Sequence, residues 1–234
     1  MSLPRHQPPI FEGIPPLETG DRLTRDEFER RYEAMPHIKK AELIEGVVYV
    51  PSPARFRRHG SPHSNTLGWL SYYKAHTPGV ETAGNGSVRL DQDTEVQPDG
   101  CLFIAPTHGG QARISDDDYI ELSPELMAEV AASSVSYDLG VKLEAYRRNG
   151  VREYVVWRVL NQAIDWFVLR EQDFVPLQPD KRGILKSLVF PGLWLDPSAM
   201  ISGELRRVLD VLNEGLATPE HAAFVARLQA AGPR

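Results

Sequence analysis

A glutamate inside an apolar run constrains this chain more than any other feature of its sequence. The run Leu126-Met127-Ala128-Glu129-Val130 has the length and the apolar content of a buried strand. An ionised carboxylate in such a strand lowers stability substantially unless it is paired with a cation or bound to a metal. Glu129 is therefore difficult to explain as scaffold, and we interpret it as a candidate functional residue.

A second acid stands at the start of another apolar run. The segment Pro98-Asp99-Gly100 leads into residues 101–104, Cys-Leu-Phe-Ile, which we predict to form a buried strand. Asp99 would lie at the start of this strand. An Asp-Gly pair is also a common turn signal, and a turn is the structural alternative for Asp99. Two carboxylates brought together by short strands could hold a divalent metal, because Mg²⁺ prefers hard oxygen ligands.

A lysine follows on a predicted helix. The small polar residues Ser133, Ser134 and Ser136 start this helix, and Asn149-Gly150 ends it. Lys142 stands four residues after Asp138, so a salt bridge on a solvated helix face is its structural alternative. Because the helix directly follows the strand of Glu129, its first turns can pack over the end of that strand. Lys142 is thus a third candidate for the same site.

The densest basic cluster of the chain precedes a predicted helix that starts at Ser61-Pro62. It reads Arg55-Phe56-Arg57-Arg58-His59-Gly60, and we predict a loop there. Arg55, Arg57 and Arg58 could neutralise phosphates, although a short basic run can equally be a solvated loop. His63 lies in the first turn of the helix, where it is either a capping residue or a further contact to a nucleic acid.

The remaining patterns predict alternating short strands and helices. We expect a helix over residues 25–35, a hairpin over 41–50 that turns at Glu45-Gly46, strands over 80–83 and 87–90, and a hairpin from 152–157 to 163–169. Helices follow beyond residue 195. Residues 1–20 are proline-rich and suit an extended arm.

Composition limits the compartment and the partners. The chain has 234 residues, a single cysteine and a net charge of -6. A lone cysteine suits a reducing interior, and no stretch reaches the roughly 18 apolar residues of a spanning helix. We therefore expect a cytoplasmic protein with no membrane partner. The acidic balance excludes a generally basic surface, so any contact with DNA must be local.

Several motifs in combination resemble the Uma-two family, a bacterial group of restriction-endonuclease-like proteins in the PD-(D/E)XK nuclease superfamily. They are Glu42-Leu43-Ile44-Glu45-Gly46, Pro98-Asp99, Glu129-Val130, Asp138-Leu139-Gly140-Val141-Lys142, and Tyr146 through Gly150-Val151-Arg152-Glu153-Tyr154. The resemblance covers residues from about 24 to 200 and preserves the order of these elements.

The resemblance implies an α/β (mixed α+β) fold, with a mixed central sheet flanked by helices. It also implies Asp99 and Glu129 as ligands of Mg²⁺ or Mn²⁺, with Glu42 as an auxiliary acid of the site. The superfamily's usual lysine position, two residues after the second acid, holds Ala131 here, and the family places the lysine at Lys142 instead. A homodimer is a further implication.

Two smaller departures from the family concern single positions. Glu45 stands where an aspartate is common, and we expect it to shape the turn of the first hairpin. Arg158 stands where an acidic residue is common, which affects local pairing and not the metal site.

We therefore predict a Mg-dependent endonuclease that hydrolyses DNA phosphodiester bonds through Asp99, Glu129, Lys142 and Glu42. Its domain spans residues 21–200, between the arm of residues 1–20 and a helical extension over 201–234. Two alternatives stay open. One is a nuclease-fold module that binds nucleic acid or assembles with partners without cutting, and the other is a metal-dependent hydrolase of a small substrate.

Overall fold

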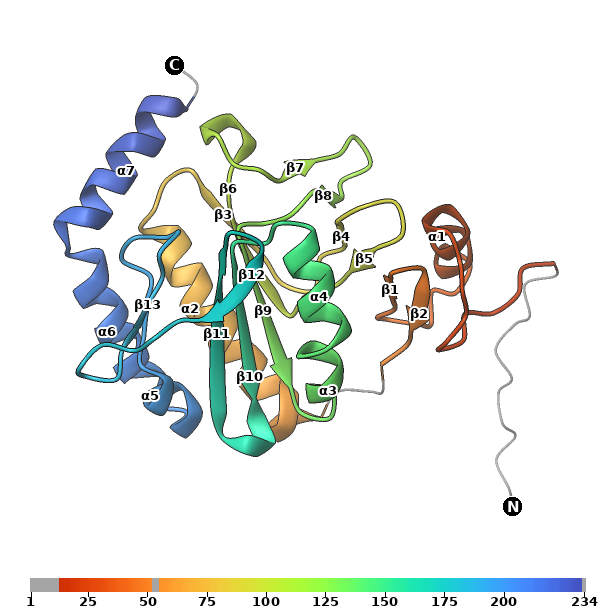
Figure 1. Ribbon diagram of the computed structural model, residues 1–234, viewed down its shortest axis with the longest axis horizontal. Coiled ribbons are helices and arrows are strands. Elements are labelled where there is room, and N and C mark those ends of the chain that lie inside the picture. Colours follow the sequence, from red (N-terminus) through yellow and green to blue (C-terminus); the bar gives the residue numbers. More distant parts are fainter. Residues whose placement is uncertain (1–12, 52–54, 233–234) are drawn as a thin grey trace.

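A six-stranded mixed sheet forms the centre of the structure, a computed structural model that describes residues 13–51 and 55–232 (Figure 1). Its strand order is β12-β11-β10-β9-β6-β3. The neighbours β9 and β10 run parallel, and the other neighbouring pairs run antiparallel. Helices cover both faces of this sheet, which confirms the mixed fold that the family resemblance implies.

The strands of the central sheet are β3 (Val80–Ala83), β6 (Gly100–Ile104), β9 (Leu126–Ala131), β10 (Glu153–Arg158), β11 (Ala163–Arg170) and β12 (Asp173–Pro176). A second sheet contains β1 (Glu42–Ile44), β2 (Val47–Tyr49), β4 (Val88–Arg89), β5 (Glu95–Val96), β7 (Arg113–Ile114) and β8 (Ile120–Glu121), and β13 (Leu185–Lys186) pairs with β14 (Trp194–Leu195). The helices are α1 (Arg25–Glu33), α2 (Ser61–Ala75), α3 (Val135–Asp138), α4 (Val141–Arg148), α5 (Pro197–Ser202), α6 (Leu205–Leu216) and α7 (Pro219–Ala231). Short helical turns are η1 (Phe56–Gly60), η2 (Pro106–His108) and η3 (Val159–Asn161).

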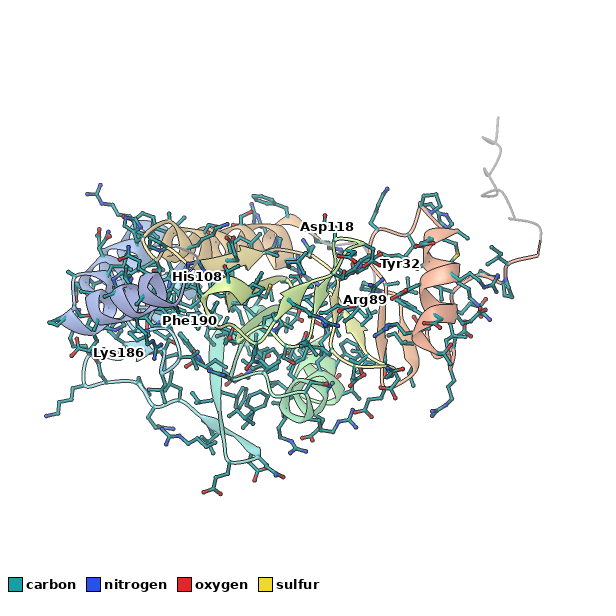
Figure 2. The ribbon with its side chains drawn as sticks, turned by 90° about the horizontal axis from the view of Figure 1, so that it is seen from above. Tyr32, Arg89, His108, Asp118, Lys186 and Phe190 are labelled. Atoms are coloured by element: carbon teal, nitrogen blue, oxygen red, sulfur yellow. The ribbon has the colours of Figure 1, made fainter. Side chains whose placement is uncertain are left out.

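Side chains along the central strands alternate between two cores. In β9, Leu126 and Ala128 join the core beneath α2, whereas Met127 and Ala131 join the core beneath α4. Figure 2 shows α2 and α4 on opposite sides of the strands. Because successive strand residues point to opposite faces, Glu129 falls on the α4 side, with Met127 and Ala131.

The second sheet extends the molecule toward α1. Figure 2 places Tyr32 and Arg89 near this end, and Phe190 and Lys186 near the opposite end. The hairpin of β1 and β2 turns at Glu45 and Gly46, both with positive φ, as its sequence predicts. Its strand β1 brings Glu42 to the edge of the α4 core.

The C-terminal helices pack against α2. Val208 and Leu212 of α6, and Phe224 and Leu228 of α7, belong to the same core as Trp69 of α2. Among the described residues, no helix combines the length and the apolar character needed to cross a bilayer.

At the other end of the chain, Leu17 is buried, and the amide of Gly20 donates to the carbonyl of Val48. The first twelve residues of the predicted arm lie outside the described part of the chain.

The structure corrects the predicted loop over residues 55–60. Residues 56–60 form a π-helical turn, η1, which continues directly into α2. The amide of Gly60 donates to the carbonyl of Arg55 and the amide of Ser61 to that of Phe56, both five residues back. Pro62 has no amide hydrogen, so it cannot continue an ordinary α-helical ladder into this segment, and the wider turn accommodates it.

The single helix predicted after the serines is also wrong, because it is broken into α3 and α4. The break lies at Leu139-Gly140. A Cβ atom at Gly140 would lie 2.4 Å from the carbonyl oxygen of Ser136, so only glycine fits this close approach. The break reorients the chain and starts α4 directly before Lys142.

We predict that Leu102→Ala destabilises the protein by about 2–5 kcal/mol, because Leu102 is fully buried on the α2 face and the substitution leaves a cavity. Urea unfolding monitored by circular dichroism measures the change. Leu188, 52% exposed, provides the control, since Leu188→Ala should shift stability by no more than about 0.5 kcal/mol. Equal effects of the two substitutions would contradict the assignment of the core.

Candidate functional site

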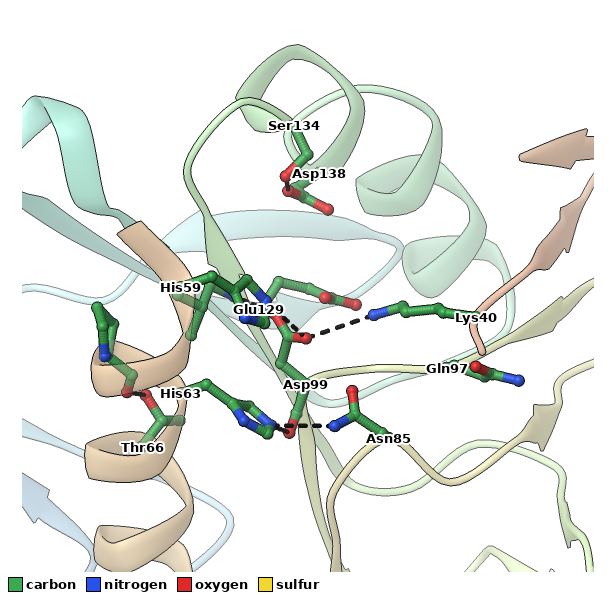
Figure 3. A network of polar contacts seen from close by, with 12 residues as sticks. Lys40, His59, His63, Thr66, Asn85, Gln97, Asp99, Glu129, Ser134 and Asp138 are labelled. Atoms are coloured by element: carbon green, nitrogen blue, oxygen red, sulfur yellow. Dashed lines mark hydrogen bonds and ion pairs between the residues drawn. The ribbon is translucent and has the colours of Figure 1, made fainter. Parts of the chain in front are cut away.

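Two carboxylates face each other across neighbouring strands. The antiparallel register of β6 and β9 pairs Cys101 with Met127 and Gly100 with Ala128. One further step along the same register places Asp99 opposite Glu129, on the α4 side of the sheet. The amide of Val130 donates to Asp99 Oδ2 at 2.8 Å, which fixes the Asp99 carboxylate against the Glu129 strand. Figure 3 shows Asp99 near Glu129, with a dashed line that joins the Asp99 carboxylate to Lys40.

The turn alternative for Asp99 is wrong, because Gly100 lies in β6. A Cβ atom at Gly100 would lie 3.0 Å from Leu70 Cδ1. The glycine after Asp99 therefore allows the strand to approach α2 closely.

Helix α4 places two side chains on Glu129. Lys142 and Tyr146 stand four residues apart, on one face of the helix. The Lys142 ammonium lies 2.8 Å from Glu129 Oε1, and the Tyr146 hydroxyl donates to the same oxygen at 2.9 Å. Lys142 is only 2% exposed, so its interpretation as part of a solvated salt bridge is wrong.

Glu42 joins the site from the second sheet. Its Oε1 atom accepts hydrogen bonds from Lys142 Nζ and from the amide of Gln97, both at 2.8 Å. A fourth acid, Asp138, lies 3.9 Å from Lys142 Nζ. The structure thus brings together the four residues predicted to be catalytic: Glu42, Asp99, Glu129 and Lys142.

Two cationic side chains that the sequence interpretation missed lie on Asp99. Lys40 Nζ is 3.3 Å from Asp99 Oδ1, and His59 Nε2 is 3.1 Å from each carboxylate oxygen. His59 belongs to the basic cluster, where only its arginines had been singled out. Lys40 is two residues before Glu42, and no motif marks it. Nothing in the local sequence indicates that the side chain of Lys40 or of His59 reaches Asp99.

The predicted nucleic-acid contacts divide into two groups. His63 Nε2 lies 2.8 Å from the carbonyl oxygen of Asp99, which can only accept, so this histidine donates and holds the backbone of the site. Arg55, Arg57 and Arg58 instead project from η1 and its first flanking residue as exposed side chains.

The surrounding charges shift the ionisation of the site. Burial alone would raise the pKa of Asp99, but the hydrogen bond from His59 and the charge of Lys40 hold it well below its usual range. Burial raises the pKa of Glu129 to about 7, against the opposing effect of Lys142. For Lys142, burial lowers the pKa, but Glu129 and Glu42 outweigh it and keep the pKa above its usual value. Lys142 therefore carries a positive charge at neutral pH.

The donor set fits a magnesium ion. Mg²⁺ in proteins is commonly held by one or two carboxylates, with waters and substrate phosphate completing its shell. Asp99 and Glu129 supply two such carboxylates from facing strand positions. Within residues 13–51 and 55–232, no group of three or more His, Cys, Asp or Glu side chains is arranged to hold a metal ion. A metal ion held by these two carboxylates would need waters or a substrate phosphate as its remaining ligands.

The site opens to the surface at its basic side. Asp99 and Glu129 are 3% exposed, whereas the side chains of Lys40 and His59 are 25% and 26% exposed. An open pocket of about 610 Å³ lies elsewhere, between Glu45 and the outer face of α4. The side of Lys40 and His59 is thus the solvent-exposed side of the site, whereas the carboxylates themselves are buried.

We predict that Lys142→Met destabilises the protein by about 3–5 kcal/mol at neutral pH, because it leaves buried carboxylates without their cation. In the variant, Glu129 and Asp138 bind protons in the folded state at pH values where the unfolded chain has released them, so stability recovers as the pH falls. Urea unfolding at acidic and at mildly alkaline pH measures this dependence.

The control is Lys74→Met, which removes an exposed ion pair with Glu81 and should cost no more than about 1 kcal/mol. A deficit for Lys142→Met that is equally large at both pH values would show that the charge of Lys142 is not what stabilises the buried acids.

Comparisons with known proteins agree with the fold. A solved structure from Anabaena variabilis, titled as a putative nuclease belonging to DUF820, matches with a TM-score of 0.56 and 14% sequence identity. The match covers 74% of this chain and 97% of that chain. At this identity the likeness shows a shared fold. No curated protein matches the chain.

A family model described as "Uma2: Putative restriction endonuclease" matches residues 25–198. The matched region contains Lys40, Glu42, His59, Asp99, Glu129 and Lys142, and thus every residue of the site described above. Because the match spans most of the sequence, the chain belongs to the Uma2 (Uma-two) family of restriction-endonuclease-like proteins.

Proposed function

We propose that this protein is a metal-dependent endonuclease that hydrolyses phosphodiester bonds of DNA. The observation that carries the proposal is the pair of opposed carboxylates, Asp99 and Glu129, with the Lys142 ammonium 2.8 Å from Glu129. The names of the family and of the solved structure, restriction endonuclease and nuclease, support the same activity.

Asp99 and Glu129 would hold Mg²⁺ or Mn²⁺, which, when bound, acidifies a water and stabilises the charge that develops on the phosphate. Glu42 and Glu129 fix the Lys142 ammonium between them. Because its pKa is raised, Lys142 acts as a fixed positive charge near the phosphate and not as a proton acceptor. Lys40 and His59, at the open side, would be the first cations that an approaching phosphate meets.

The lysine of the site lies outside the superfamily's usual sequence position, on α4 and not in β9. Ala131, which occupies the usual position, is buried in β9 and has no charge. Lys142 reaches Glu129 from α4 at hydrogen-bonding distance. This geometry supports Lys142 as the replacement for the missing strand lysine.

We expect Asp99→Asn, Glu129→Gln and Lys142→Ala each to reduce cleavage of plasmid DNA in Mg²⁺ or Mn²⁺ by about 100-fold or more, since each removes charge from the reacting centre. Gel assays of the purified variants, with circular dichroism to confirm folding, measure the loss. Chelation of the metal should abolish cleavage by the unchanged protein.

Glu153 provides a matched control. It is also a buried glutamate whose pKa burial raises to about 7, but it binds Ser187 and the amides of Leu188 and Val189. Glu153→Gln should retain cleavage wherever it retains folding. Cleavage that survives both Asp99→Asn and Glu129→Gln would overturn the proposed site.

A nuclease-fold module that binds nucleic acid without cutting it is the second candidate. The observation that favours it is that Lys40, His59 and Lys142 already neutralise the carboxylates. Such a module would bind DNA equally well with and without a divalent metal, and would show no cleavage with either ion.

The contact between His59 and Asp99 gives a pH dependence. Asp99 raises the pKa of His59, so this contact stabilises the fold fully below the ordinary histidine pKa of about 6.5 and loses its effect as the pH rises through the raised value. The lowered pKa of Asp99 means that the contact is lost again as the pH falls well below the ordinary aspartate value of about 3.9.

We therefore predict that His59→Gln lowers stability by about 1 kcal/mol near pH 6, and by less at alkaline pH. Thermal unfolding across this range measures the effect. His37→Gln, at an exposed position, is the control and should show no such window. A loss for His59→Gln that grows toward alkaline pH would contradict the assigned ion pair.

The homodimer and the cytoplasmic location stay predictions.

A further inference from the structure

The turn that brings His59 to the site also exposes an aromatic ring. Phe56 opens η1, and its side chain is 76% exposed. Phenylalanine is usually among the buried residues of a protein, although a single exposed apolar side chain needs no explanation by itself. The surroundings of Phe56 are what give it significance.

Three arginines flank the ring. Arg55, Arg57 and Arg58 are exposed, and none of them forms a salt bridge to another of the described residues. Elsewhere exposed or half-exposed arginines such as Arg30, Arg147 and Arg182 pair with glutamates. This turn therefore keeps an uncompensated positive charge on a chain whose net charge is -6. Such a turn attracts phosphates.

The ring lies at the border of the candidate site. Phe56 is three residues before His59 in the same turn, and His59 contacts both carboxylate oxygens of Asp99. η1 also contacts η3, at the end of β10, where Leu160 is 58% exposed. An exposed ring, three exposed arginines and a second exposed apolar side chain thus lie on η1, beside it and on the neighbouring η3, and η1 also carries His59.

We propose that Phe56 stacks on an unpaired base of a DNA strand bound over the site, while Arg55, Arg57 and Arg58 contact the neighbouring phosphates. The inference rests on the proposed function and specifies its substrate class as DNA with unpaired bases. In an intact duplex the faces of each base are covered by its neighbours, so an exposed ring can stack only where a base is unstacked. Cationic side chains interleaved with an aromatic ring are the arrangement that binds single strands without reading their sequence.

The test measures binding without cleavage. Fluorescence anisotropy in EDTA compares a labelled single-stranded oligonucleotide with the same sequence as a duplex. The unchanged protein should bind the single strand more tightly. Phe56→Ala should weaken single-strand binding by about 5- to 100-fold, the range expected for one lost stacking contact, and should leave duplex binding nearly unchanged. Phe56→Trp should retain the preference.

Two further variants separate stacking from charge. Leu188→Ala, at a 52% exposed position outside this turn, is the matched apolar control and should bind both DNAs as the unchanged protein does. Arg57→Ala should weaken binding of both DNAs and reduce the salt dependence of the affinity, because it removes a phosphate contact.

Two results would overturn the inference. One is that the unchanged protein binds the duplex more tightly than the single strand. The other is that Phe56→Ala changes the affinities for the two DNAs equally, or changes neither. Cleavage assays of the same proteins with Mn²⁺ distinguish this failure from failure of the proposed function. If the unchanged protein cleaves DNA but Phe56→Ala does not alter binding, only the stacking role of Phe56 is wrong. If the protein prefers single strands through Phe56 but never cleaves DNA, the stacking role is supported and the proposed nuclease activity is wrong.

Discussion

The pairing of Asp99 with Glu129 across β6 and β9 is the interaction on which the arrangement around it depends. Like charges at facing strand positions repel each other, and burial increases this cost. Lys142, Lys40 and His59 offset it, and each comes from a different part of the chain: α4, the segment before β1, and η1. η1, the segment before β1 and α4 are therefore all connected to the same pair of carboxylates.

This charge arrangement also limits the chemistry. Lys142 is held between Glu42 and Glu129 and carries a fixed charge, whereas the partly exposed Lys40 and His59 lie at the open side. A ligand that replaces their contacts with Asp99 must bring its own positive charge to that carboxylate. A divalent metal with a bound phosphodiester would satisfy this requirement, because the carboxylates would coordinate the metal and the phosphate would pair with the displaced Lys40 and His59.

Local sequence patterns and motifs predict much of the fold and four of the six charged residues of the site. The hairpins at 42–49 and 153–170 and the buried strand around Glu129 follow from short-range signals, namely turn residues and apolar runs. The contacts of Lys40 and His59 do not, because they depend on which distant segments meet. The π-helical turn at η1 was missed for a related reason, since Pro62 affects the geometry of residues before it.

The contact between Lys142 and Glu42 joins residues separated by 100 positions in the chain. Closing a segment of this length is entropically unfavourable until the strands between them have paired. Lys142 therefore gains its second carboxylate partner, Glu42, only when the second sheet has joined the central sheet. A molecule in which the second sheet has opened therefore loses the Glu42 partner of Lys142, although Lys142 and Glu129 are only 13 positions apart in the chain.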